Sequence, residues 1–235
     1  YVTFEGNNNV MLQLVAKRLL GDYAKAFKSP DFGTLAQSVA GQVGEATINR
    51  GGLRGLAQNI VDFGSTARSV GYVKDEEHQH QLLTDRVHTM VANIANKLKA
   101  AGSDKSKQAE LFNRHQNDLI KAAKAHAELI MWEAFTSALK TIKDEDSLKI
   151  LTWLRDLYGF GLLEENLDWY LINGRLSAAR AEAITEYIDT RLLPRLKPHA
   201  ESLVNEFELT PGLVRTTLAC DEATRKASRK NLVWI

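Results

Sequence analysis

The spacing of apolar residues constrains the fold most, because it is helical along nearly the whole chain. Apolar residues recur three or four positions apart in segments separated by glycine, proline or a capping residue. This is the pattern of amphipathic helices. No segment alternates convincingly with period two, and no Asn-Gly turn lies between β-branched runs, so nothing indicates a sheet. The sequence therefore predicts an all-α fold.

The first two expected helices have clear start or stop residues. An N-terminal helix begins after Asn8 or Asn9, whose side chains suit an N-cap, and ends at Gly21. Helical spacing returns over residues 83–98, and Gly102 closes that helix. Seven glycines and prolines fall within residues 29–55, which predicts a connecting segment with at most short helical pieces.

The longest helix is expected over residues 110–142. Asp144 or Asp146 is placed to cap the next helix, which Gly159 and Gly161 are expected to interrupt before a short helix up to Tyr170.

A last helix begins at Ser177 and ends at Pro194. Four long amphipathic helices with short connections fit an up-and-down bundle.

Composition and charge exclude several classes of protein. The chain has 235 residues, of which 44% are apolar and 25% charged, and its net charge of +1 gives no argument for nucleic acid as a partner. Its single cysteine, Cys220, excludes an internal disulfide. No apolar run is long enough to span a membrane, and no targeting signal is visible. The opening residues do not include a Met, and we expect a piece of a longer protein.

The candidate functional residues lie before the first helix. Glu5 and Gly6 are followed by three asparagines and then by the helical pattern. Taken alone, Glu5 is a solvated carboxylate, with Gly6 and Asn7 turning the chain. The histidines do not have the four-residue spacing of helical zinc ligands, so we expect no metal site. Trp132, Trp153 and Trp169 lie in apolar helices and are expected in the core.

Five sequence blocks together resemble the acyl-CoA oxidases. The run from Phe4 to Gln13 is similar to their signature of an aromatic residue, Glu-Gly, polar residues and a helix, although Asn7 and Asn9 stand where the family usually has an acidic residue and a threonine. The other blocks follow in the family's order: Ala122-Ala123-Lys124-Ala125-His126, Leu157-Tyr158-Gly159, Asn173-Gly174-Arg175-Leu176-Ser177 and Leu196-Lys197-Pro198-His199-Ala200.

The resemblance implies a fold and a division of the chain. The fold is an up-and-down helical bundle of the acyl-CoA dehydrogenase C-terminal-domain type. Residues 1–28 would end a first C-terminal helical domain that carries the catalytic glutamate, and residues 29–70 would connect it onward. Residues 71–209 would form the second C-terminal bundle that the oxidases have, and residues 210–235 a C-terminal tail. The family's central β-barrel and N-terminal domain do not match any part of this sequence.

The resemblance also implies an activity. The full-length protein would be an FAD-dependent oxidoreductase that desaturates fatty acyl-CoA to trans-2-enoyl-CoA in fatty acid β-oxidation, with O2 reduced to H2O2. Glu5 would be the catalytic base, and Gly6, Asn7 and Asn9 would contact FAD. The alternatives are an acyl-CoA dehydrogenase that passes electrons to an electron-transferring flavoprotein, and a non-catalytic helical interaction module.

The implied partners are fatty acyl-CoA, O2 and a second copy of the protein in a homodimer, with no nucleic acid and no membrane span. The implied location is the cytoplasm in a bacterium and the peroxisome in a eukaryote. The 235 residues alone are expected to bind no FAD and to be inactive, because the resemblance places most of the flavin site in the missing domains.

Overall fold

The chain forms helices at the places where its sequence supplies caps and an apolar face. The computed structural model describes residues 7–26, 71, 73–102, 104–209, 221–223 and 226. These residues contain helices and no strand, which confirms the all-α prediction. They fall into two units that divide between Leu193 and Pro194, and each is described by itself.

Helix α1 spans Asn8–Ala26 and begins one residue earlier than the predicted caps allow. The Oδ1 atom of Asn7 accepts a hydrogen bond from the Asn9 backbone N–H at 3.0 Å, so Asn7 supplies the capping side chain rather than Asn8 or Asn9. The predicted end at Gly21 is wrong, because α1 continues through it. A glycine inside a helix costs only about 1 kcal/mol, which packing on the rest of the fold offsets.

Helix α5 spans Glu76–Lys99 and is capped by Asp75, whose carboxylate accepts from the His78 N–H. Gly102 follows with a φ of 58°, as the sequence predicts for a helix end. The predicted helix 110–142 is instead two helices, α6 (Lys105–Arg114) and α7 (Gln116–Leu139), which meet at His115. The apolar pattern does not reveal this division, because α6 has no buried residue whose spacing could mark a separate helix.

Helix α8 spans Glu145–Glu164 and begins with Asp144 as its cap, one of the two predicted candidates. Gly159 and Gly161 do not interrupt it, contrary to the prediction. The short helix α9 (Leu167–Ile172) follows.

Helix α10 (Ala178–Tyr187) begins at the predicted cap, Ser177. The helical path does not end at Pro194. A π turn, η1 (Ile188–Leu192), leads into α11 (Leu193–Leu196), and the Leu193 N–H donates to the Ile188 carbonyl. The wider turn changes the hydrogen bonding just before Pro194, which itself has no N–H to donate.

The second unit contains a 3-10 turn, η2 (Lys197–His199), and helix α12 (Ala200–Asn205).

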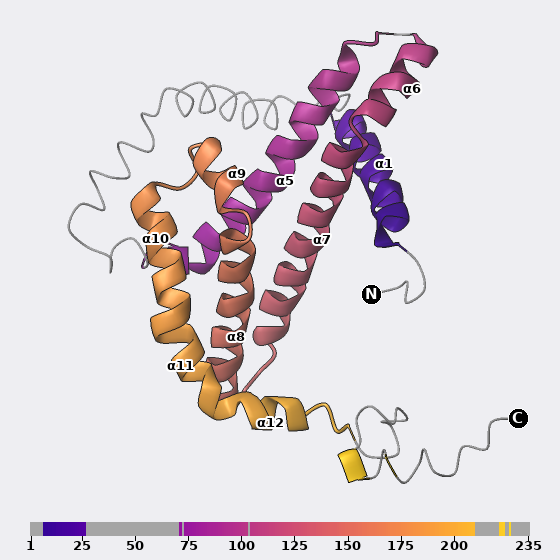
Figure 1. Ribbon diagram of the computed structural model, residues 1–235. Helices are drawn as coiled ribbons and strands as arrows, with labels where there is room; N and C mark the ends of the chain where they lie inside the picture. The colour runs from indigo at the N-terminus through magenta and orange to yellow at the C-terminus, as the bar shows by residue number, and fades with distance from the viewer. Residues whose placement is uncertain are drawn as a thin grey trace, which may run out of the picture. The chain divides into compact units, whose positions relative to one another are not determined.

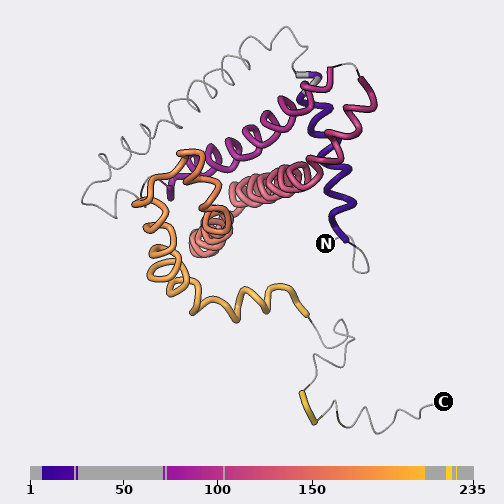
Figure 2. Tube along the Cα trace, turned by 45° about the horizontal axis from the view of Figure 1, so that its top comes forward, coloured from indigo at the N-terminus to yellow at the C-terminus, as the bar shows by residue number. Residues whose placement is uncertain are grey.

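In the first unit, α5, α7, α8 and α10 run in alternating directions, which confirms the predicted up-and-down bundle (Figure 1). Helix α7 packs against both α5 and α8, and α10 packs against α8. Helix α1 lies against α7 and touches α5 (Figures 1 and 2). The N-terminal helix therefore uses the bundle as its packing partner.

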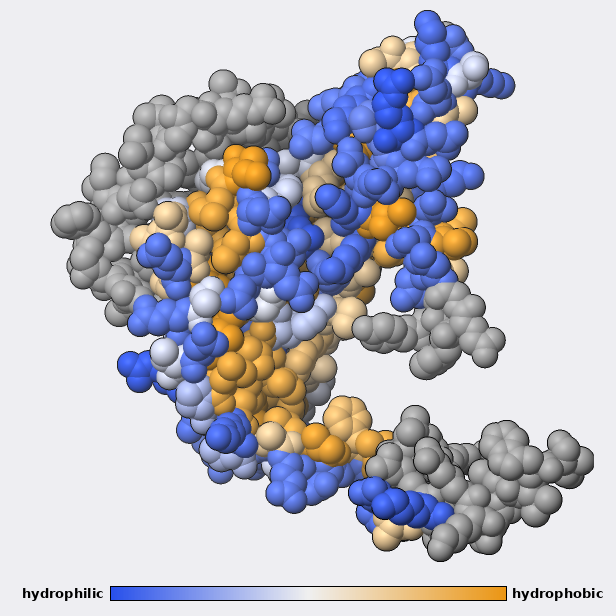
Figure 3. All heavy atoms as spheres, in the orientation of Figure 1, coloured by the Kyte–Doolittle hydropathy of each residue, from blue (hydrophilic) through white to orange (hydrophobic). Residues whose placement is uncertain are grey.

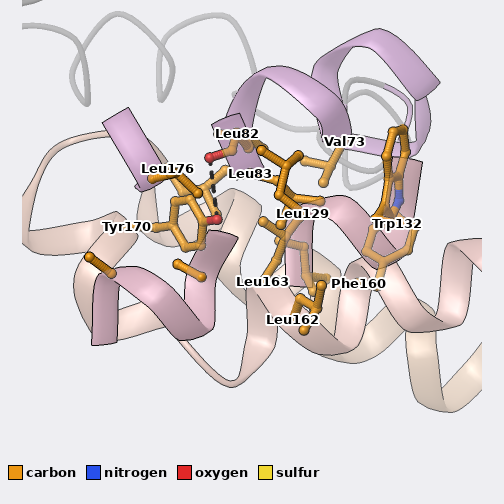
Figure 4. Packing of buried hydrophobic residues seen from close by; sticks show 14 of the residues in the cluster. Val73, Leu82, Leu83, Leu129, Trp132, Phe160, Leu162, Leu163, Tyr170 and Leu176 are labelled. Carbon is orange, nitrogen blue, oxygen red and sulfur yellow. Dashed lines mark hydrogen bonds between the residues drawn. The ribbon is translucent and has the colours of Figure 1, made fainter. Parts of the chain in front are cut away.

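The core of the first unit lies between α5, α7, α8 and α9 (Figure 4). Leu82 and Leu83 of α5 face Leu129 of α7 and Leu163 of α8 in this core, and all four are buried. The ring of Tyr170 is fully buried, and its hydroxyl donates to the Leu82 carbonyl at 3.3 Å. Its buried polar atom is therefore paired, as burial requires.

Candidate functional site

The start of α1 is the one part of the predicted catalytic motif that the structure describes. Glu5 and Gly6 lie outside the described residues, so their roles stay predictions. Asn7 and Asn9 are exposed, and the structure brings them together through the capping bond from the Asn9 N–H to Asn7 Oδ1. The Asn7 oxygen thus has a structural role, while its exposed Nδ2 amide can donate a hydrogen bond to a bound group.

Helix α1 packs against the bundle through a narrow apolar stripe. Among its described side chains only Ala16 is buried, with 2% of its surface exposed. Leu12, Val15, Leu20 and Tyr23 are half-buried and pack against the core cluster to which Ala16 belongs. These positions recur at three- and four-residue intervals, so they lie on one face of the helix.

The N-terminal half of α1 also carries apolar residues on its outer side. Val10, Met11 and Leu14 have exposed fractions of 62%, 42% and 61%. Figure 3 shows hydrophobic residues at the surface around this end of the helix. The helix that follows Glu5 is therefore apolar on two sides, of which one is packed on the bundle.

A buried hydrogen-bonded chain joins α5, α7 and α8. Trp132 Nε1 donates to Gln79 Oε1 at 3.2 Å, and Gln79 Nε2 donates to Asp156 Oδ1 at 3.4 Å. Gln79, Trp132 and Asp156 each have 2% or less of their surface exposed. The burial of Trp132 confirms its predicted place in the core, whereas Trp153 and Trp169 are only half-buried against it.

Gly159 of α8 lies directly against the hydrogen-bonded side chains of Gln79 and Trp132. A Cβ atom at position 159 would come within 2.3 Å of Gln79 Oε1 and 2.8 Å of Trp132 Nε1. Only glycine lets α8 approach this closely. Close packing of α8 on Gln79 and Trp132 therefore explains the glycine in the Leu157-Tyr158-Gly159 block.

The Arg155 guanidinium lies beside the hydrogen-bonded residues Gln79, Trp132 and Asp156. Its guanidinium bonds Asp156 and Glu76 at 2.9 Å each and lies over the Trp132 ring, 5.2 Å from the centroid. Burial raises the pKa of the Asp156 carboxyl above its ordinary value, and this outweighs the lowering effect of Arg155 and Gln79. Sequence inspection missed these residues, because partners 77 positions apart leave no local pattern.

A second buried polar group joins α5 and α7 to the connection between α8 and α9. Arg86 of α5 bonds Glu128 of α7 at 2.9 Å and Asn166 Oδ1 at 2.7 Å. Lys124 approaches Glu128 at 3.4 Å from the solvent side. Removing either partner of such a pair would leave an uncompensated buried charge, which is strongly destabilising.

Two further sequence blocks, Ala122–His126 and Asn173–Ser177, also have structural reasons. In the Ala122–His126 block the three alanines are buried where α7 meets its neighbours, and burial lowers the pKa of His126. In the Asn173–Ser177 block, Gly174 has a φ of 62° and Ser177 caps α10. Arg175, also buried, pairs with Asp85 at 3.1 Å. These residues pack the bundle and shape its turns.

A cavity of about 530 Å³ opens where the start of α5 meets the end of α7. His80 and Glu133 bond across it at 2.7 Å, and the His80 ring stacks on Trp132. Its lining is Asp75, Glu76, Glu77, His80, Trp132, Glu133, Thr136, Ser137 and Lys140. Four carboxylates make this cavity unsuited to a phosphorylated ligand such as a coenzyme A thioester.

Metal-ligating clusters and membrane-spanning helices are both absent from the described residues. Among them, no group of three His, Cys, Asp or Glu side chains is arranged to hold a metal ion. None of their helices is long and apolar enough to cross a membrane.

Comparisons with known proteins agree with the sequence blocks. The family model described as acyl-CoA oxidase matches residues 75–221, which is more than half of the chain. The chain is 26% identical over 226 residues to acyl-coenzyme A oxidase 2, peroxisomal, of Arabidopsis thaliana. It is 27% identical over 223 residues to peroxisomal acyl-coenzyme A oxidase 2 of Rattus norvegicus. Each alignment covers 93% of this chain and 30% of the relative.

Solved structures show the same fold. The chain superposes on Arabidopsis thaliana acyl-CoA oxidase 1 with a TM-score of 0.62 at 22% identity. It superposes on an acyl-CoA oxidase from Lycopersicon esculentum with a TM-score of 0.64 at 21% identity. Each superposition covers 88% of this chain and 29% of the other.

The fold is thus the helical bundle of the acyl-CoA oxidases. The chain belongs to the acyl-CoA oxidase family and spans about 30% of the length of the curated relatives that it matches.

Proposed function

We propose that this chain is the C-terminal part of an FAD-dependent acyl-CoA oxidase. The full-length enzyme would desaturate fatty acyl-CoA to trans-2-enoyl-CoA in fatty acid β-oxidation and reduce O2 to H2O2. The family match over residues 75–221 carries this proposal. The Glu-Gly motif directly before α1 supports it, because it supplies a carboxylate where the chemistry needs a base.

The reaction removes a proton from the α-carbon and a hydride from the β-carbon of the thioester. We assign the proton to the Glu5 carboxylate. An acyl chain that excludes water from this carboxylate would raise its pKa and make it a stronger base. The Glu5 backbone N–H would donate to the thioester oxygen and stabilise the negative charge that develops there. Gly6 would let the backbone approach the ligand without a Cβ clash.

The flavin would accept the hydride when bound, and O2 would take up the two electrons and two protons to give H2O2. The described residues of the motif, Asn7 and Asn9, offer hydrogen-bond donors that suit a flavin. The exposed amides of Asn7 and Asn9 can donate hydrogen bonds to flavin oxygens or phosphates. Asn7 would do so through Nδ2, since its Oδ1 accepts from the Asn9 N–H.

The domain division follows from the same proposal. Residues 1–28 would end the first C-terminal helical domain, 29–70 would connect, and 71–209 would form the second bundle of a homodimeric enzyme, with 210–235 as a tail. Two of the relatives are named as peroxisomal, which supports a peroxisomal location for a eukaryotic source and leaves the cytoplasm for a bacterial one. The isolated 235 residues would be colourless as purified, which a flavin absorbance spectrum checks.

The direct test is Glu5→Gln in the full-length enzyme. The amide is nearly isosteric but cannot accept the proton, so kcat should fall by several orders of magnitude. FAD content and acyl-CoA binding should be retained. A variant with activity within a few-fold of wild type would contradict the assignment of Glu5 as the base and favour a non-catalytic role for this helical region of the enzyme.

The fate of the electrons separates an oxidase from a dehydrogenase. Flavin reduced by acyl-CoA should be reoxidised rapidly by dissolved oxygen, with one H2O2 formed for each enoyl-CoA. If peroxide is absent and only an electron-transferring flavoprotein restores the flavin colour, the enzyme is a dehydrogenase.

A further inference from the structure

The three methionines of the sequence have different surroundings in the structure. Met131 of α7 has 59% of its surface exposed, and Met11 of α1 has 42%. Met90 of α5 is half-buried and packs against the core cluster. Peroxide oxidises a methionine thioether to a sulfoxide, and exposure governs how readily a side chain is attacked. Met131 is therefore the most accessible of the three to a dissolved oxidant.

A tyrosine hydroxyl of the neighbouring helix α8 donates a hydrogen bond to the Met131 sulfur. The Tyr158 hydroxyl lies 3.7 Å from Met131 Sδ and 3.4 Å from the backbone carbonyl oxygen of Glu128. Because the hydroxyl has a single hydrogen, it shares that hydrogen between two acceptors, and both distances are long. Burial raises the pKa of Tyr158 above its ordinary value, with further contributions from Glu128 and Glu165, so the hydroxyl keeps its hydrogen. Tyr158 is thus a donor that a better acceptor could engage more strongly.

Oxidation of Met131 would supply that better acceptor. A thioether sulfur accepts hydrogen bonds weakly, whereas the side chain becomes polar when the sulfur carries an oxygen. A methionine side chain has three rotatable bonds, so the sulfoxide oxygen can turn toward the Tyr158 hydroxyl. Since Met131 is largely exposed, this oxygen need not enter the core. The same oxidation at Met90 would place a polar group against the core cluster.

We propose that Met131 is a site of reversible oxidation by peroxide and that the Tyr158 hydroxyl holds the sulfoxide. A sulfur lone pair attacks one oxygen of H2O2, so an S–O bond forms as the O–O bond breaks. The sulfur loses two electrons, and the other oxygen takes up the remaining proton and leaves as water. The oxidised side chain would join α7 to α8 more strongly than the thioether does. This inference rests on the proposed function only for the origin of the oxidant, because an acyl-CoA oxidase would itself release H2O2.

The experiment uses variants of the 235-residue chain that each keep one methionine. Met11→Leu/Met90→Leu retains Met131, and Met90→Leu/Met131→Leu retains Met11 as the matched exposed control. Exchanges between methionine and leucine nearly conserve volume, so the fold should tolerate them. A third variant adds Tyr158→Phe to the first. Each is alkylated at Cys220, so that the thiol does not react, and is then treated with H2O2 and followed by peptide mass spectrometry and thermal melting.

In the variant that keeps Met131, oxidation should raise the melting temperature by about 1–3 °C, the effect of one partly exposed hydrogen bond in a chain of this size. The rise should be absent with Tyr158→Phe and in the variant that keeps Met11. Methionine sulfoxide reductases should reverse it. In the wild-type chain, a limiting dose of H2O2 should oxidise Met131 several-fold faster than Met90. If a double variant does not fold, the wild-type chain and Tyr158→Phe are compared at this limiting dose.

The inference is overturned if Met131 is oxidised no faster than Met90, or if its oxidation leaves the melting temperature unchanged or lowers it. A rise that persists with Tyr158→Phe overturns it as well. The origin of the oxidant is tested separately in the full-length enzyme, with acyl-CoA in air and with catalase as the control. If added H2O2 oxidises Met131 in that enzyme but turnover does not, the proposed function fails while the oxidation site stands.

Discussion

Helices α1 and α7 lie side by side but are held in very different ways. Helix α7 has 24 residues, of which nine are buried, and it contacts α1, α5 and α8. Helix α1 has 19 residues, and Ala16 alone is buried among its described side chains. The weakly held helix is the one attached to the predicted catalytic motif. We therefore expect the stability of the first unit to reside mainly in the bundle, with α1 contributing less.

Truncation of one leucine in each region should show the largest difference in stability between the bundle and α1. Leu83 of α5 is buried in the core, and Leu83→Ala should lower the unfolding free energy of the 235-residue chain by about 2–5 kcal/mol. Leu12 of α1 is only half-buried, so Leu12→Ala should lower it by about 1 kcal/mol or less. Urea denaturation followed by circular dichroism measures both values.

Hydrogen exchange sharpens the same comparison. Leu12→Ala should accelerate exchange in α1 and leave α5 and α7 protected. Equal acceleration in all three helices would show that α1 and the bundle unfold as one cooperative unit, and the distinction would fail.

Glycine substitutions in α8 should have the next largest effect. Gly159→Ala places a methyl group against Gln79 and Trp132 and should destabilise the chain by about 1–3 kcal/mol. Gly161→Ala is the matched control, because apart from the backbone of its own helix and its chain neighbours nothing lies within 4 Å of its added Cβ. It should stabilise α8 by up to about 1 kcal/mol through helix propensity. Thermal melting of the two variants should shift in opposite directions, and equal shifts would refute the packing role of Gly159.

The smallest expected effect is pH-dependent. The hydrogen bond from Lys97 holds the pKa of Asp118 below its ordinary value, with a further contribution from His115. Because the pKa is lower in the folded state, the ionised carboxylate stabilises the fold at pH values above the unfolded pKa of 3.8. This stabilisation is lost as the pH falls through the folded pKa. Because both side chains are nearly half exposed, Asp118→Asn should lower the unfolding free energy by only a few tenths of a kcal/mol at pH 7.

The difference between wild type and Asp118→Asn should shrink below about pH 4 and in 1 M salt. Chemical denaturation across pH 3–7 measures it. A difference that stays constant across this range would mean that the Lys97–Asp118 bond does not respond to protonation.

The sequence predicted several local features correctly and the long-range contacts not at all. The caps at Asp144 and Ser177 and the end at Gly102 were predicted because each depends on neighbouring residues. Gly159 was interpreted as a helix breaker, but it is a contact point for Gln79, 80 positions earlier in the chain. A glycine that interrupts a helix and one that permits close packing look alike in sequence. The same limit applies to Pro194, whose accommodation depends on the π turn before it.

The candidate site was predicted through family resemblance rather than through spacing. On its residues alone, Glu5 was a solvated carboxylate, and only its place in a signature followed by further blocks gave it a role. Its assignment as the base stays a prediction. The buried Arg86–Glu128 pair was not predicted, because its partners are 42 positions apart on different helices.

The buried links between distant residues also bear on the order of folding. Neighbouring helices of the bundle can pair through short loops, and such local contacts favour rapid folding. The bonds from Gln79 to Asp156 and from Tyr170 to Leu82 close loops of 77 and 88 residues, which carry a larger entropic cost. We expect them to form after the transition state. Changes at these residues should then leave the folding rate nearly unchanged and accelerate unfolding, so that the links determine how long the finished bundle persists.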